Sequence, residues 1–399
     1  MRMKFNKSGQ LLLVSAASLV AASLLSACAT LTVDFVYITS AKAAGPDSYG
    51  EVDVFEVNSE SGHMRQIPTS PFPSGGRNPV AEAVSVDHNN LYVVNQDDNT
   101  IVQFAIGNDG KLYPQNTVNT PGVFPRAVAV AGTNLYVADT YQPLPTCSPA
   151  APCAGSVAVF PISTTGALGT PAVNSAIGAS YWPLILPSSQ KDVVVPTGIT
   201  VLASGSNAYV SAFDSTSRAG YIFAFDASGG TLAPLNGGVP IPAGIHPSSI
   251  ASDPSGNYVY VTDFASGNVL GYTVSSGVLT PLSGSPFPAG NSPSSIAIDT
   301  GGKFAYVANS QDSTVTGYSL NGGVMTQIAS YATGTQPVAV GIDPSLNQYV
   351  YTANFLGNTV SGFQLSAKDG TLLNAQNSPF ASNAEPTAIA AIPHGSQKK

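Results

Sequence analysis

The segment PSSIASDPSGNYVYVTDFASGNVLGYTVSSGVLTPLSGSPF, residues 247–287, is the clearest copy of a unit that recurs along the chain of 399 residues. A second copy starts at Pro293 with PSSIAIDTGGKFAYVANSQDSTVTGY, and a third starts at Pro337 with PVAVGIDPSLNQYVYTANFLGNTVSGF. Internal repeats with a period of a few tens of residues are typical of solenoids, propellers and related arrays. The fold is therefore expected to consist of one structural unit used many times.

The leading proline of this unit can be followed through the whole chain. Its successive spacings are 46, 71, 51, 46, 44 and 49 residues. Most of these intervals are close to the length that a four-stranded propeller blade needs. The interval of 71 residues indicates one unit with insertions. The seven prolines are Pro79, Pro125, Pro196, Pro247, Pro293, Pro337 and Pro386.

Alternating apolar residues and turn signals predict four strands within each unit. In the copy at residues 247–287 the strands are the SSIAS, YVYVTD and VLGYTV segments and a last one that ends at SPF. The DPSGN and SGN segments between them favour tight turns. The second strand recurs seven times, starting near Phe35, Leu91, Leu135, Ala208, Tyr258, Phe304 and Tyr349.

The two ends of the repeat array complement each other. The segment DFVYITS, residues 34–40, is a second strand without a first strand before it, and TAIAAI, residues 387–392, is a first strand with no unit after it. Pairing these segments would close a ring and leave no long open sheet edge. We therefore expect an all-β, seven-bladed β-propeller with four antiparallel strands per blade over residues 28–393, followed by a tail at 394–399.

Residues 1–27 have the pattern of a targeting signal. A basic start is followed by the apolar run 11–25, which is too short to span a membrane. The segment Leu25-Ser26-Ala27-Cys28 is typical of a bacterial lipobox, so we expect lipidation at Cys28 and a lipid anchor in the cell envelope, at the outer membrane or cell surface. An ordinary signal peptide is the alternative, because Ala27-Cys28-Ala29 also fits a small-residue cleavage site. Both interpretations predict export.

Composition narrows the classes of partner. The chain is 43% hydrophobic but only 9% charged, and removal of residues 1–27 would leave 11 basic against 22 acidic residues. This acidic balance disfavours nucleic acid, whose binding requires neutralised phosphates, and a polybasic membrane-binding surface. We expect a monomer that needs no cofactor, that touches the membrane only through its lipid, and whose unknown ligand is a carbohydrate or a protein.

Two cysteines lie close together in TCSPAAPCAG, residues 146–155. In an exported protein a close pair of this kind favours a disulfide, here between Cys147 and Cys153. A metal site would need further Cys or His residues nearby, and the segment has none. The expected bond lies in one of the two insertions of the 71-residue unit.

The second insertion of that unit, residues 177–195, contains Tyr181 and the only tryptophan, Trp182. Both insertions are expected on the top face of the ring, where the first strands begin. Extended loops on one face of a rigid scaffold often carry binding residues. The sequence therefore favours Tyr181 and Trp182 as ligand-binding residues, and the alternative is that Trp182 closes the channel mouth as a structural plug.

Polar residues are expected around the same face. Glu82, Asp139, Asp214 and Asp263 are candidate ligand-binding residues, for a sugar or for a divalent cation. The alternative is that such carboxylates cap turns by accepting hydrogen bonds from backbone N–H groups. No pair of histidines has metal-ligand spacing, so no metal site is predicted. His246 and Arg126 are the candidate catalytic residues, because both are expected at the top of the channel.

The repeat cores DPSGNYVYVTD and DTGGKFAYVAN, with the strands that follow them, resemble the seven-bladed lactonase family of 6-phosphogluconolactonase type and the YVTN-repeat propellers. This resemblance implies hydrolysis of a sugar lactone in carbohydrate metabolism. In proteins of this family the residues that follow the leading proline often include Arg and His. This chain departs from that pattern: only Pro125 is followed by an Arg, Arg126, and His246 precedes Pro247 instead of following it. A phosphorylated substrate would meet a mostly neutral, net-acidic funnel.

Two function classes follow from these residues. The main hypothesis is a non-catalytic module that binds a ligand or a protein on the top face. The alternative is a hydrolase of a sugar lactone, with His246 as the general base and Arg126 stabilising the oxyanion. Proximity of His246, Arg126 and a rim carboxylate within hydrogen-bond reach would favour the hydrolase, and a rim without such a cluster would favour the binding module.

Overall fold

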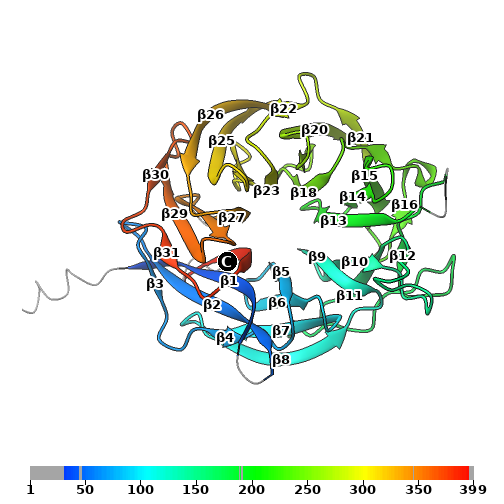
Figure 1. The fold of residues 1–399 in the computed structure, drawn as a ribbon, viewed down its shortest axis with the longest axis horizontal. Coiled ribbons are helices and arrows are strands. Elements are labelled where there is room, and N and C mark those ends of the chain that lie inside the picture. Colours follow the sequence, from blue (N-terminus) through cyan, green and yellow to red (C-terminus); the bar gives the residue numbers. More distant parts are fainter. Residues whose placement is uncertain (1–30, 45–46, 188, 190–191, 345, 395–399) are drawn as a thin grey trace, which may run out of the picture.

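Seven antiparallel sheets stand around a common axis and form a closed ring (Figure 1). This computed structural model describes residues 31–44, 47–187, 189, 192–344 and 346–394. The predicted signal peptide, Cys28 and residues 395–399 of the predicted tail lie outside the described residues. Within the described residues, no helix is long and apolar enough to cross a membrane. The predicted seven-bladed, all-β propeller is confirmed.

Each blade is built from four strands, which we count outward from the channel. The first strands of blades 1 to 7 are β32 (Pro386–Pro393), β5 (Pro79–Val84), β9 (Val123–Ala131), β13 (Val194–Val201), β18 (Pro247–Ser252), β23 (Pro293–Ile298) and β27 (Pro337–Ile342). The second strands are β1 (Thr32–Ala44), β6 (Asn90–Asn95), β10 (Asn134–Tyr141), β14 (Asn207–Asp214), β19 (Tyr258–Asp263), β24 (Phe304–Asn309) and β28 (Tyr349–Asn354).

The outer half of each blade is less regular. The third strands are β2 (Tyr49–Asn58), β7 (Thr100–Ile106), β11 (Ser156–Pro161), β15 (Gly220–Asp226), β20 (Asn268–Ser275), β25 (Thr314–Asn321) and β29 (Thr359–Leu365). The fourth strands are β3 (Met64–Gln66), β8 (Leu112–Asn119), β12 (Trp182–Pro183), β16 (Ala233–Pro234), β21 (Val278–Pro281), β26 (Val324–Ala332) and β30 (Leu372–Asn374). Short extra segments pair with four third strands: β4 (Phe72–Pro73), β17 (Ile241–Pro242), β22 (Phe287–Pro288) and β31 (Phe380–Ala381).

The second strands form the core of the ring. All six residues of β6, β24 and β28 are buried, because each blade is covered by a neighbouring blade on both faces. Such strands are rich in Val, Tyr and Ala, which fit a pleated and fully covered surface. The blade interfaces therefore supply the hydrophobic core, and the turns at the two ends of the ring carry the polar residues.

Tyrosines in the second strands connect neighbouring blades. In five places the buried hydroxyl donates a hydrogen bond to a glycine carbonyl in the turn between the third and fourth strands of the next blade. The donor–acceptor distances are 2.7 to 3.1 Å. A Cβ on one of these glycines, Gly323, would collide with the ring of Tyr258, so the turn needs glycine. The pairs are Tyr37–Gly110, Tyr92–Gly166, Tyr209–Gly277, Tyr260–Gly323 and Tyr306–Gly370.

The ring closes as expected from the sequence. Strand β32, from the C-terminal end, pairs antiparallel with β1 from the N-terminal end, with Phe35 opposite Ile392 and Thr39 opposite Ala388. Figure 1 shows the red C-terminal strand beside the blue N-terminal one. One blade is thus completed by both ends of the chain, which gives β1 a partner on its channel side.

Blade 3 carries the insertions of the 71-residue unit. The loop between β10 and β11 contains the predicted disulfide, Cys147–Cys153, with the two Cα atoms 5.5 Å apart. This prediction is confirmed. The remaining insertions lie on either side of β12, between β11 and β13.

Trp182, a candidate ligand-binding residue from the sequence, is not exposed to a ligand. Trp182 lies in β12 opposite Val157 and is 3% exposed, packed in the core cluster shared with blade 4. The Trp182-Pro183 dipeptide occupies the place that Phe72-Pro73 and Phe287-Pro288 occupy in other blades, each pairing with the start of a third strand. Trp182 therefore anchors an outer strand and has no surface to offer a ligand.

Candidate active site

His246 lies at the top face of the ring, immediately before β18. Its backbone N–H donates to Oδ1 of Asp263 at 2.8 Å, which holds the chain at the end of β19. The half-buried imidazole lies edge-on between two aromatic rings, with centroid distances of 4.2 Å to Phe213 and 5.7 Å to Phe264. These contacts fix the ring plane and leave the ring nitrogens free of any protein hydrogen bond within the described residues.

A pocket of about 530 Å³ opens beside His246. Residues from three consecutive blades line it, because the loops that enter the first strands and leave the second strands meet on this face. Its volume lies in the range of small-molecule sites. The lining residues are Phe213, Ser215, Arg218, Ile245, His246, Phe264, Ala265 and Ser292.

Arg218 is the pocket residue that sequence reasoning missed. It lies in the turn between β14 and β15, with φ of 60°, and its guanidinium has no hydrogen bond or ion pair among the described residues. The corresponding turns 264–267 and 310–313 contain no basic residue. A basic residue in only one of these three turns is a signal that the sequence contains. The position of that turn beside His246, however, follows only from the folded ring.

Arg126 lies on β9, in blade 3, and it does not line the pocket. Its side chain is solvent-exposed, yet the surrounding protein lowers its pKa through desolvation. Strand β9 is the innermost strand of blade 3 and borders the central channel (Figure 1), and an exposed but partly desolvated guanidinium fits this place. The positive charge of Arg126 lowers the pKa of His246, which lies two blades away. The two residues therefore interact electrostatically across the channel mouth, although only His246 lines the pocket.

The pKa of His246 is lowered from its ordinary value. Burial is the largest cause, followed by the positive charge of Arg126; Asp263 acts in the opposite direction, and Arg218 lowers the pKa further. The imidazole is therefore neutral at pH 7. A neutral imidazole beside a guanidinium can accept a proton while the cation stabilises a developing negative charge.

Two of the predicted ligand-binding carboxylates cap turns instead. Asp214 accepts hydrogen bonds from the N–H groups of Thr216 and Ser217 and is 2% exposed. Asp263 is 1% exposed and accepts from four donors: the N–H groups of Ile245, His246 and Ala265, and the hydroxyl of Ser266. Their predicted contact with a ligand is corrected, since their oxygen atoms are already occupied.

Asp139 is also in an interior position. Its carboxylate is fully buried and accepts from the N–H of Gly122 at 3.2 Å, while its Oδ1 has no partner. Burial raises its pKa to about 8, so the carboxyl group is mostly protonated at pH 7. Asp139 is too deep to meet a ligand, and its predicted binding role is corrected.

Glu82 lies on β5 and faces blade 1. Its Oε2 accepts from the hydroxyl of Thr39 at 2.6 Å, its Oε1 is buried without a partner, and burial raises its pKa to about 8. Glu82 does not line the pocket beside His246. The four predicted carboxylates are therefore not brought together in one site.

Tyr181 is half-buried next to β12, on the outer side of blade 3, and it does not line the pocket either. The backbone oxygen of Tyr181 accepts from Nδ2 of Asn174 at 3.2 Å. In the described part of the chain, no group of three or more His, Cys, Asp or Glu residues could hold a metal ion.

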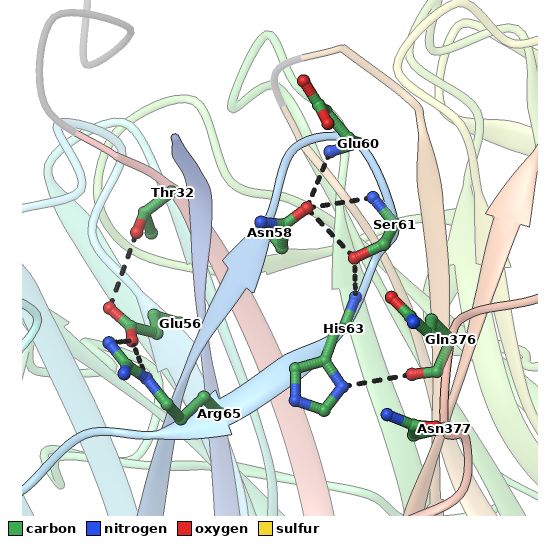
Figure 2. Close-up of a pocket in the computed structure, with 9 residues that line it drawn as sticks. All are labelled: Thr32, Glu56, Asn58, Glu60, Ser61, His63, Arg65, Gln376 and Asn377. Atoms are coloured by element: carbon green, nitrogen blue, oxygen red, sulfur yellow. Dashed lines mark hydrogen bonds and ion pairs between the residues drawn. The ribbon is translucent and has the colours of Figure 1, made fainter. Parts of the chain in front are cut away.

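A second hollow, of about 490 Å³, lies on the opposite face between blades 1 and 7 (Figure 2). Its polar groups largely bind one another. Asn58 Oδ1 accepts from the N–H groups of Glu60 and Ser61, and the ring of His63 contacts the backbone oxygen of Gln376 at 3.2 Å. The bonds to Asn58 lie within blade 1, and the contact between His63 and Gln376 joins blade 1 to blade 7, so we interpret this hollow as a structural junction.

The comparison with protein families assigns the chain to a class. A family model described as "Lactonase, 7-bladed beta-propeller" matches residues 48–142 and 242–395, more than half of the sequence. The chain therefore belongs to the seven-bladed β-propeller lactonase family. His246 and Arg126 lie in the matched segments, whereas Phe213 and Arg218 lie in the unmatched one.

Solved structures share the fold at low sequence identity. A periplasmic gluconolactonase from Pseudomonas aeruginosa is 15% identical, with a TM-score of 0.71, 91% of this chain and 100% of that chain covered. A Bacteroides fragilis protein, provisionally described as a 6-phosphogluconolactonase, is 18% identical, with a TM-score of 0.71 and coverages of 91% and 99%. A Bacteroides uniformis protein with the same provisional description is 17% identical, with a TM-score of 0.70 and coverages of 91% and 100%. No curated protein matches the chain in sequence.

Proposed function

We propose that this protein hydrolyses lactones in the pocket beside His246. One observation carries the proposal: a neutral imidazole and an unpaired guanidinium, from His246 and Arg218, line one small-molecule pocket of a lactonase-family propeller. A similar protein from Pseudomonas aeruginosa is described as a periplasmic gluconolactonase, which supports a ring ester as the substrate.

The proposed reaction needs only a base, a cation and water. His246 accepts a proton from a water molecule, whose oxygen attacks the lactone carbonyl carbon. Arg218 stabilises the oxyanion of the tetrahedral intermediate. The bond between the carbonyl carbon and the ring oxygen then breaks, and the ring oxygen takes the proton from the imidazolium. The product is an open-chain hydroxy acid, which ionises and releases one proton to the solvent.

In this scheme the predicted role of Arg126 changes. Arg126 does not line the pocket, so Arg218 takes the oxyanion-stabilising role and Arg126 acts at longer range by keeping His246 neutral. The predicted cluster of His246, Arg126 and a carboxylate is not formed, but Arg218 lines the pocket together with His246. The hypothesis of a non-catalytic binding module drew on Trp182 in the top-face insertion, and that side chain is buried. The lactone hydrolase, the alternative from sequence, is therefore the better supported proposal.

Replacement of His246 by Gln tests the proposal. We expect kcat for δ-lactones, followed as proton release at constant pH, to fall by about 10²- to 10⁴-fold, because a positioned general base contributes about that much. The His63→Gln variant is the matched control, since His63 lies in the hollow on the opposite face and should leave kcat unchanged. Wild-type rates equal to the spontaneous hydrolysis, or full activity in His246→Gln, would overturn the proposal.

A further inference from the structure

One side of the pocket beside His246 is apolar. Ile245 is 49% exposed and Phe264 is 39% exposed, and the half-buried Phe213 lies next to them. Large apolar side chains gathered around a concave site usually contact the apolar part of a ligand. This cluster indicates a substrate with an apolar group.

The pocket has few groups that could bind the hydroxyls of a sugar. The nearest carboxylates, Asp214 and Asp263, are buried and hydrogen-bonded to their own turns. Of the two serines in the lining, Ser292 already donates to the side chain of Gln311 at 3.3 Å. A ring with several hydroxyls would leave some of them against apolar walls without partners, which is costly.

The apolar wall comes partly from a region that the family model does not match. Phe213 and Arg218 lie in blade 4, in the segment 143–241 that the family model does not match, whereas Ile245 and Phe264 lie in the matched segment. The family scaffold thus supplies His246, and blade 4 adds one aromatic wall and the cation. Substrate preference can therefore differ from that of other family members while the chemistry stays the same.

We propose that the preferred substrate is a lactone whose ring carries an alkyl chain, with the chain packed between Phe213, Ile245 and Phe264 and the ring carbonyl directed at Arg218. This inference rests on the proposed lactone hydrolysis and names the class of substrate. A volume of about 530 Å³ accommodates a six-membered ring with a chain of about five carbons.

Three six-membered lactones separate the possibilities: δ-decalactone, which carries a pentyl chain; δ-valerolactone, which has no substituent; and glucono-δ-lactone, which carries hydroxyls. We expect kcat/KM for δ-decalactone to exceed that for either of the others by at least about tenfold, because burial of methylene groups favours the alkyl lactone. Spontaneous hydrolysis of each lactone is measured without enzyme and subtracted.

A variant of the wall provides the structural test. Ile245→Ala should lower kcat/KM for δ-decalactone by about tenfold and leave δ-valerolactone within about twofold, because Ile245 lines the pocket without an aromatic contact to His246. Leu356→Ala is the matched control, because Leu356 is 62% exposed in the corresponding turn of blade 7 and does not line the pocket. Equal losses for both lactones in Ile245→Ala would overturn the inference.

The outcomes for the inference and for the proposed function are distinct. If glucono-δ-lactone has a higher kcat/KM than δ-decalactone, the alkyl preference is wrong and lactone hydrolysis stands. If none of the three lactones is hydrolysed faster than in buffer, lactone hydrolysis itself is wrong, and the preference falls with it.

Discussion

At the scale of single residues, the chemistry of the pocket depends on the protonation state of His246. Burial and the charges of Arg126 and Arg218 lower its pKa, and the nearby Asp263 only partly opposes them. The carboxylate of Asp263 is engaged with backbone N–H groups, so it positions the loop before β18 rather than pairing with the imidazole. The base is thus kept neutral by its surroundings.

Arg126→Gln should move the pH dependence of kcat/KM. Loss of the positive charge removes a cause of the lowered pKa, so the pKa of His246 rises and the acid limb of the profile shifts to higher pH. The base must be neutral to act, so the variant loses activity first at the acid end and keeps it at pH 8. Arg65→Gln, on the opposite face, is the control; an acid limb that stays in place in Arg126→Gln would contradict the assigned coupling.

At the scale of elements, β12 contains an aromatic-proline pair that recurs in other blades, but in blade 3 it lies within an insertion. Because the blade-3 unit is 71 residues long, the spacing of the repeat does not reveal that Trp182-Pro183 corresponds to the Phe-Pro pairs of β4 and β22. Each pair closes the outer edge of a blade by pairing with the start of the third strand. The aromatic ring then packs inward between blades, which is the position observed for Trp182.

Trp182→Ala should lower the free energy of unfolding by about 3–5 kcal/mol, because it leaves a cavity in the core between blades 3 and 4. Urea denaturation followed by circular dichroism measures the change. Tyr113→Ala is the matched control: Tyr113 is an aromatic residue on β8 that is 49% exposed, and its loss should change stability by no more than about 0.5 kcal/mol. Similar effects of the two substitutions would contradict the core position of Trp182.

At the scale of the whole molecule, stability depends on how blade 7 meets blade 1. The junction differs from the tyrosine–glycine pairs elsewhere in the ring, because the hydroxyl of Tyr351 donates to Oδ2 of the buried Asp34 at 3.3 Å. Burial and the nearby Asp343 raise the pKa of Asp34 to about 9. The closing junction therefore contains a carboxyl group that is protonated at neutral pH.

Asp34→Asn should stabilise the ring at alkaline pH. The pKa of Asp34 is higher in the folded chain than in the unfolded chain, so its contribution to stability is fully present below about pH 4 and is lost as pH rises toward 9. The loss amounts to at most about 1.4 kcal/mol per pH unit over this interval. Asn is the isosteric neutral replacement, and melting temperatures at pH 5, 7 and 9 should therefore fall less steeply in the variant; parallel profiles would contradict a protonated Asp34.

Much of the fold follows from the sequence alone, because local patterns repeat. Seven second strands with alternating apolar residues, the leading prolines and the complementary ends were enough to predict seven blades and ring closure. The Cys147–Cys153 bond could be predicted for the same reason, since both partners lie in one short loop. The targeting signal and lipidation at Cys28 stay predictions, because residues 1–30 lie outside the described residues.

The candidate site was only partly predictable, because it combines turns from different blades. His246 was found as a rare residue at a recognisable place in the repeat, but Arg218 became a candidate only when the ring placed its turn beside the next blade. The roles of Asp214, Asp263 and Trp182 depend on burial and on hydrogen-bond partners, and neither is encoded by position in the repeat. Periodicity along the chain determines which strands form, whereas the contacts between blades determine which side chains remain free to meet a substrate.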